Sequence, residues 1–143
     1  MKMVKIGLIL ITTSLLFSCN KKDIERACTK DMPGISGSYK LTGFQYKMTP
    51  ASAPVDYLAS MDACEKDDII VLKQDGTYIY NDAGNQCSPN GSDYGTWSMS
   101  GNTINSDGIV YGIIQSYDCT TLVCYYENIN ISGDRYTLTL TKQ

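Results

Sequence analysis

Residues 64–87 read CEKDDIIVLKQDGTYIYNDAGNQC, and this stretch decides the fold. Two short runs within it, residues 68–73 and 77–80, are rich in the β-branched and aromatic side chains that favour strands. Between them, Asp75-Gly76 can supply the positive φ angles of a tight hairpin turn. A cysteine stands at each end of the stretch, at Cys64 and Cys87. We therefore predict a β-hairpin whose open end is closed by a Cys64–Cys87 disulfide in an oxidising compartment.

The chain after residue 34 repeats this alternation of short apolar runs and turn residues. Residues 135–141, RYTLTLT, alternate most regularly, which is typical of a strand with one buried and one wetted face. No ten-residue stretch of the region has sustained helical periodicity, although residues 55–61 within the connecting segment 49–63 fit one helical turn over the mouth of the fold. We predict eight strands, at residues 37–44, 68–73, 77–80, 94–100, 103–105, 109–117, 121–129 and 135–141.

Nearly all the connections between these strands are short enough to be hairpin turns. Consecutive antiparallel strands joined in this way form a meander, and eight of them close naturally into a small barrel. A two-sheet sandwich is the alternative, but a Greek-key sandwich needs long crossings between its sheets. The sequence therefore predicts an all-β, eight-stranded antiparallel up-and-down barrel.

The N-terminus has the pattern of an export signal. Lys2 and Lys5 precede residues 6–17, a mostly apolar run that is too short to span a bilayer as a helix. Residues 16–19, Leu-Phe-Ser-Cys, resemble a bacterial lipobox, which implies cleavage before Cys19 and lipidation of its thiol. The alternative is an ordinary signal peptide followed by a chance cysteine. We predict a lipoprotein signal peptide at residues 1–18, a flexible tether at 19–34 and one barrel domain at 35–143.

The predicted anchor places the protein at the outer membrane or the cell surface, facing the periplasm or exposed outside. Without Lys2 and Lys5, the chain has 10 basic and 15 acidic side chains and a net charge of −5. This balance disfavours binding to nucleic acid, because phosphate backbones are held by clustered lysine and arginine. The sequence leaves the oligomeric state open.

Three further cysteines, Cys28, Cys119 and Cys124, belong to the exported part of the chain. We predict a second bridge between Cys119 and Cys124 across a tight turn, with Cys28 bonded to one of them as the alternative. The chain contains no histidine and no C-x₂-C pair, so the sequence predicts no zinc site.

Catalytic machinery is equally hard to find. Without histidine, the commonest general base is missing, and serine or cysteine nucleophiles lose their usual partner. Glu65, Asp67 and Asp68 form the densest acidic cluster, which is more typical of a solvated loop before a strand than of an acid–base pair or a calcium site. We predict that the protein is not an enzyme and has no catalytic residue, metal or cofactor.

Several short motifs together resemble a known family. They are the lipobox, Gly-Ser-Tyr at 37–39, CEKDD at 64–68, DGTY at 75–78 and GTWS at 95–98. In this order they resemble the lipocalin-like domain lipoproteins of Bacteroidetes, over residues 35–143. The resemblance implies a lipocalin-like barrel on a lipid anchor. Tyr39 stands where ordinary lipocalins have the tryptophan of a G-x-W motif.

The aromatic side chains give the best indication of function. The chain has 11 tyrosines, and tyrosines inside a barrel would form an apolar wall with hydroxyl groups for specificity. We predict a binding protein for a small apolar or amphipathic ligand. The alternative is a structural or interaction lipoprotein with a filled barrel that acts through its surface and loops. The residues expected to line the cavity are Ile70, Leu72, Tyr78, Tyr111 and Leu138.

Overall fold

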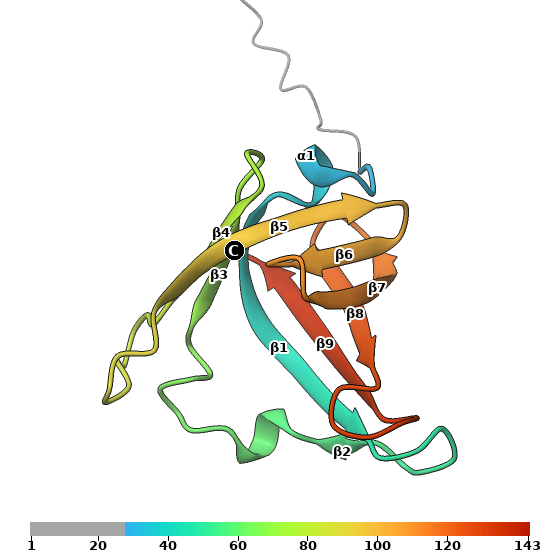
Figure 1. Cartoon of the computed structure of the whole chain (residues 1–143). Helices are drawn as coiled ribbons and strands as arrows, with labels where there is room; N and C mark the ends of the chain where they lie inside the picture. Colours follow the sequence, from blue (N-terminus) through green and yellow to red (C-terminus); the bar gives the residue numbers. More distant parts are fainter. Residues whose placement is uncertain (1–27) are drawn as a thin grey trace, which may run out of the picture.

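A computed structural model of the protein describes residues 28–143 (Figure 1). The predicted signal peptide and Cys19, the predicted site of lipidation, lie outside the described residues. Within them, no helix is long and apolar enough to cross a membrane. The elements are α1 (Met32–Ile35), β1 (Gly37–Lys47), β2 (Val55–Asp56), the 3₁₀ turn η1 (Leu58–Ser60), β3 (Ile69–Leu72), β4 (Thr77–Asn81), β5 (Asp93–Ser100), β6 (Thr103–Ser106), β7 (Val110–Tyr117), β8 (Thr121–Glu127) and β9 (Arg135–Lys142).

The strands form a closed antiparallel barrel, which confirms the predicted fold class. Each strand from β3 to β9 pairs with its neighbour in sequence, and β1 pairs with both β3 and β9 to close the sheet. The short β2 adds a two-residue pairing to the far end of β1. It lies in the predicted connecting segment, and η1 supplies the helical turn expected there.

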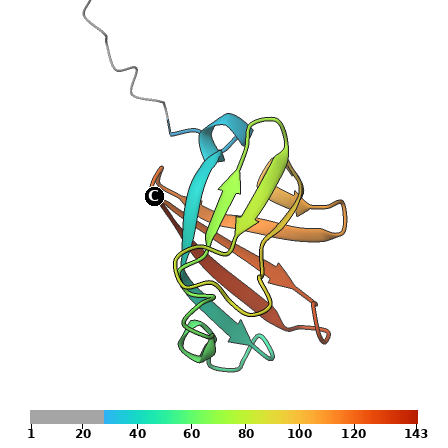
Figure 2. The same cartoon turned by 90° about the vertical axis from the view of Figure 1, so that its left-hand side faces the viewer.

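The barrel is open at one end because β1 is much longer than β3. Only Gly37, Ser38, Tyr39 and Lys40 of β1 pair with β3, whereas the pairing with β9 continues to Lys47. Beyond Lys40, the edge of β1 that faces β3 has only the two-residue β2 as a partner. The segment from β2 to β3 therefore crosses the gap between the strands, at the end of the barrel opposite α1 (Figures 1 and 2).

The other end is closed by α1. The Asp31 side chain caps this helix by accepting a hydrogen bond of 2.8 Å from the Gly34 amide. The carbonyl of Gly34 in turn accepts from the Tyr117 hydroxyl at 2.7 Å and from Lys142 Nζ at 3.2 Å. The Tyr39 hydroxyl donates to the carbonyl of Ile35, and both residues are fully buried. Residues 28–34 are therefore part of the folded domain, and the prediction of a flexible tether was wrong for them.

Two disulfide bonds add covalent links between segments of the described chain. One bond joins Cys64 to Cys87, and the other joins Cys28 to Cys119 in the β7–β8 turn. The predicted Cys119–Cys124 bridge is wrong, because Cys124 lies on β8 with a free thiol that is 2% exposed. Its side chain points into the barrel while Cys119 is held beside the α1 segment. The open alternative, a bridge from Cys28, is the one that forms.

Candidate functional site

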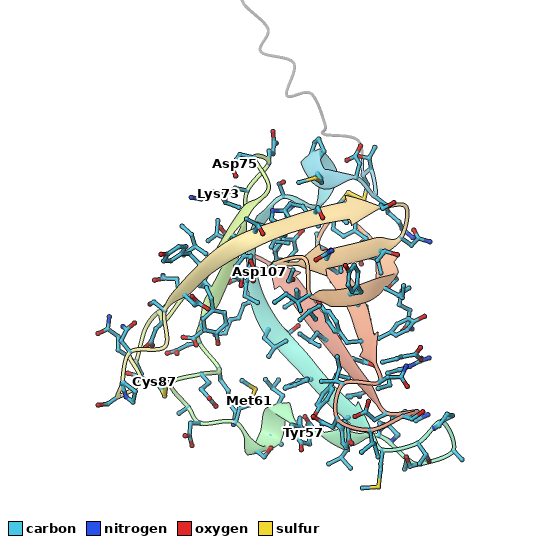
Figure 3. The ribbon with its side chains drawn as sticks, viewed as in Figure 1. Tyr57, Met61, Lys73, Asp75, Cys87 and Asp107 are labelled. Atoms are coloured by element: carbon cyan, nitrogen blue, oxygen red, sulfur yellow. A yellow bond between two sulfur atoms is a disulfide. The ribbon has the colours of Figure 1, made fainter. Side chains whose placement is uncertain are left out.

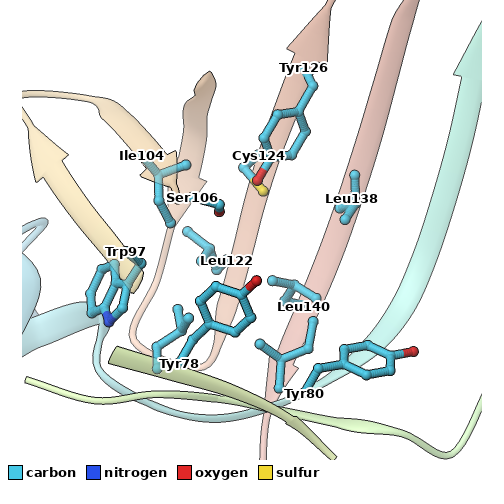
Figure 4. Close-up of a pocket in the computed structure, with 12 residues that line it drawn as sticks. Tyr78, Tyr80, Trp97, Ile104, Ser106, Leu122, Cys124, Tyr126, Leu138 and Leu140 are labelled. Carbon is cyan, nitrogen blue, oxygen red and sulfur yellow. The ribbon is translucent and has the colours of Figure 1, made fainter. Parts of the chain in front are cut away.

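The barrel encloses a cavity of about 210 Å³ (Figure 4). Side chains alternate between the two faces of each strand, so the inward ones of β3, β4, β6, β8 and β9 line its wall. One further residue, Trp97, comes from β5. Most of the lining side chains are aliphatic or aromatic, with the Ser106 hydroxyl and the Cys124 thiol among them. The lining residues are Ile70, Leu72, Tyr78, Tyr80, Trp97, Ile104, Ser106, Leu122, Cys124, Tyr126, Leu138 and Leu140.

A second, shallower pocket of about 380 Å³ lies at the open end. Its wall shares Tyr126 and Leu138 with the inner cavity, so these two side chains stand at the junction of the two spaces. The outer pocket is also lined by Phe44, Tyr57, Val110, Ile129 and Tyr136. We call the inner cavity and the outer pocket together the barrel site.

Aromatic rings in edge-to-face and tilted contacts build one side of the outer pocket. The ring of Phe44 lies 5.6 Å from that of Tyr57 and 5.5 Å from that of Tyr136, which are separations at which aromatic pairs attract. The Tyr57 amide donates to the carbonyl of Phe44 at 2.7 Å and so ties the crossing segment to β1. Figure 3 shows Tyr57 and Met61 at this open end, opposite Lys73 and Asp75.

Two tyrosine hydroxyls of the inner wall are engaged by carboxylates. Tyr80 donates to Asp68 Oδ2 at 2.7 Å, and Tyr78 donates to Asp107 Oδ2 at 2.8 Å. Burial and the hydrogen bond to Asp68 raise the pKa of Tyr80, while the hydrogen bond to Asp107 and burial raise the pKa of Tyr78 to about 12. Both phenols therefore stay protonated at neutral pH and act as donors.

The titratable groups at the junction of the two spaces, Cys124 and Tyr126, are also uncharged at neutral pH. Burial raises the pKa of the Cys124 thiol to about 11, although a hydrogen bond with Tyr126 opposes the shift. Burial also raises the pKa of Tyr126, whose hydroxyl lies beside the Cys124 sulfur (Figure 4). The described residues place no group of three or more cysteine, aspartate or glutamate side chains where it could hold a metal ion. The barrel site is thus an uncharged, mainly apolar space with a few hydroxyl groups.

Four of the five residues predicted to line a cavity, Ile70, Leu72, Tyr78 and Leu138, are in the inner wall. The prediction for Tyr111 was wrong, since its side chain is 59% exposed. Its neighbour Gly112 takes the buried position on β7, where a Cβ atom would come within 2.6 Å of the Tyr126 ring.

Tyr126 and the residues that line only the outer pocket were not predicted from the sequence. The alternation of Leu122, Cys124 and Tyr126 is a signal that could have placed Tyr126 inside. The outer pocket combines side chains of β1, the crossing segment, β7, β9 and the β8–β9 loop. No local pattern links these segments.

Residues 35–143 match the model of a family described as a lipocalin-like domain. No curated protein matches the chain, and no solved structure does so either.

Proposed function

The chain belongs to the lipocalin-like domain family, and on this premise we propose that its barrel binds a small apolar or amphipathic molecule. The observation that carries the proposal is the mainly apolar cavity inside the barrel, which shares the wall residues Tyr126 and Leu138 with an outer pocket at the open end. A ligand can lie with its apolar part inside the barrel and its other end at the mouth. The alternative of a completely filled barrel would leave neither space.

The dimensions and chemistry of the site support this proposal. The outer pocket falls within the range of about 300–1,000 Å³ that is typical of small-molecule sites, and the inner cavity extends it inward. Each methylene group that leaves water for such an apolar space contributes about 0.8 kcal/mol. The hydroxyls of Tyr57 and Tyr136 at the mouth can orient a polar group of the ligand.

The proposal includes the location of the protein. Cleavage before Cys19 and lipidation of its thiol would anchor the chain at the outer membrane or the cell surface, as a lipoprotein of the Bacteroidetes type. The support for this part is the lipobox-like sequence at residues 16–19. Metabolic labelling with a radioactive fatty acid tests it: the wild-type chain should incorporate label and Cys19→Ala should not.

Binding is tested with a neutral fluorescent probe, N-phenyl-1-naphthylamine, and with a variant that fills the junction. Leu138→Trp places a bulky ring between the two spaces, and we expect it to weaken probe binding about tenfold or more. Val123→Trp is the control, because Val123 alternates with the buried Leu122 and Cys124 and lines neither space. Circular dichroism should show that both variants are folded. A wild-type protein without affinity for the probe, or a folded Leu138→Trp variant with unchanged affinity, would contradict the proposal.

A further inference from the structure

The charge distribution around the open end restricts the kind of ligand. Neither part of the barrel site is lined by a lysine or arginine among the described residues. Three carboxylates are buried in the described part of the chain. Asp68 accepts from the hydroxyl of Tyr80 in the inner wall, Asp82 follows the end of β4, and Asp134 precedes β9 at the open end. Figure 1 shows the start of β9 at the end of the barrel away from α1.

None of these three carboxylates is paired with a cation in the described part of the chain. Asp68 accepts hydrogen bonds from the Tyr80 hydroxyl and, at 3.2 Å, from the Ala83 amide. Asp82 accepts from the amides of Cys87 and Gly91. Amide and hydroxyl donors satisfy hydrogen bonds but carry no net charge, so these contacts bring no positive charge to the carboxyl groups.

Asp134 is the most completely enclosed of the three, with no exposed surface. It accepts from the amides of Ile129, Asn130 and Ile131 at 2.8, 2.9 and 3.2 Å. Burial alone would raise its pKa, but these hydrogen bonds outweigh burial and keep the pKa below its ordinary value. The group is therefore ionised at neutral pH, directly beside the loop that carries Ile129 of the outer pocket.

Four basic side chains of the described residues have positions or partners outside the barrel site. Lys47 of β1 lies opposite Arg135 of β9 in the strand register. Both side chains are on the outer face, because the adjacent residues Tyr46 and Tyr136 face inward. Arg135 forms a salt bridge with Glu127 and covers the ring of Tyr125. Lys66 donates to the carbonyl of Ala59 at 3.2 Å. Lys142 is at the closed end, bonded to Gly34 and Tyr117.

We propose that the barrel site takes an amphiphile whose head group carries no negative charge, such as an alcohol, and discriminates against the matching carboxylate. This inference rests on the proposed function and specifies its ligand class. An anionic head in the outer pocket would lose water, meet no cation and approach the ionised carboxylate of Asp134, and each of these effects opposes binding. An uncharged hydroxyl loses less on desolvation and can hydrogen-bond to the tyrosines at the mouth.

The test compares 1-decanol with decanoate at pH 8, each displacing N-phenyl-1-naphthylamine from the full chain. The two molecules have the same chain length and differ in head-group charge. We expect decanol to bind about tenfold more tightly or better. Val110→Lys should reduce the difference, because Val110 lines the outer pocket, is 41% exposed and can carry a solvated ammonium group. The ratio of decanoate affinity to decanol affinity should rise about fivefold in this variant.

Gln74→Lys is the matched control for the added charge. Gln74 is exposed in the β3–β4 turn between Lys73 and Asp75, at the closed end (Figure 3). This variant should change neither affinity. Decanoate that binds the wild-type protein as tightly as decanol would overturn the inference and leave the proposed function intact. If decanoate affinity rises equally in both lysine variants, net charge rather than the barrel site sets the preference, and the inference is also overturned. If neither amphiphile displaces the probe, the proposed function fails and the inference fails with it.

Discussion

Cys124 shows how one position in a strand determines the chemistry of a side chain. It alternates with outward residues on β8, so its thiol lies inside the barrel, 2% exposed and with a pKa of about 11. A thiol with that pKa is about one part in a thousand thiolate at pH 8. Because only the thiolate is a nucleophile, burial makes this free cysteine inert.

The first prediction concerns this thiol. Ellman's reagent at pH 8 should not detect Cys124 in the native protein within the time that free cysteine reacts. In guanidinium chloride the same thiol should react completely, and Cys124→Ala should lose that equivalent. Rapid reaction in the native protein would mean that the side chain does not face the cavity.

Asp134 leads to a pH-dependent stability. Its pKa is lower in the folded than in the unfolded state, where it is about 3.9, so the ionised form favours folding. The resulting stability is fully present above the unfolded-state pKa and is lost as the pH falls through the folded-state pKa.

The second prediction is that Asp134→Asn lowers the urea midpoint of unfolding at pH 7 and lowers it much less at pH 3. The amide keeps one acceptor oxygen but brings its own donors against three backbone N–H groups. Asp62→Asn, at an exposed position, is the control and should leave both midpoints unchanged. Equal losses at the two pH values would indicate a packing effect instead.

At the scale of the elements, the β3–β4 hairpin depends on a covalent closure outside its strands. Four pairs join the two strands, from Ile69 with Asn81 to Leu72 with Tyr78. The Cys64–Cys87 bond lies beyond the ends of both strands and closes a separation of 23 residues. The Cys28–Cys119 bond spans 91 residues and holds the segment before α1 against the barrel.

The third prediction compares the two bonds. A Cys64→Ala, Cys87→Ala variant should lose about 3.5 kcal/mol of unfolding free energy from chain entropy, and a Cys28→Ala, Cys119→Ala variant about 4.5 kcal/mol. Urea denaturation followed by Trp97 fluorescence measures both, since Trp97 is buried in the core. If the shorter loop proves the more important one, contacts made by the bridges rather than loop closure dominate their effect.

The elements differ in how far the sequence could predict them. The hairpin at residues 64–87 and the strand β9 could be predicted from the sequence, because turn residues and alternation are local signals. Residues 109–113, IVYGI, do not alternate, so the side that faces inward is decided by the distant ring of Tyr126 over Gly112. The partner of Cys119 was equally out of reach, because it depends on how α1 closes the barrel. The two-residue β2 is too short for any pattern.

At the scale of the whole molecule, the two ends of the barrel have different roles. The N-terminal segment arrives at the closed end, where Cys28 is bonded to Cys119. The outer pocket is at the opposite end. Cys28 is nine positions after Cys19, and nine steps of the chain reach at most about 30 Å. The 11 residues of β1 extend the molecule by about 35 Å. If residue 19 is held at a surface, the open end of the barrel therefore points away from that surface.

The fourth prediction tests this orientation. The chain is coupled through residue 19 to vesicles that contain an energy-acceptor lipid, and a donor dye is attached to Gln74→Cys or Met48→Cys. Gln74 is in the closed-end turn, and Met48 is 57% exposed just after β1 at the open end. Energy transfer should be more efficient from Gln74→Cys. Equal efficiencies would show that the barrel turns freely on its tether.

The bridge between Cys28 and Cys119 also determines how the molecule responds to traction. A pull on the N-terminal segment reaches the sheet at the turn between β7 and β8 as well as through α1 and β1. The load is thus divided between β1 and the β7–β8 turn, so β1 does not bear it alone. Reduction of this single bond would leave α1 and then β1 to bear the whole force.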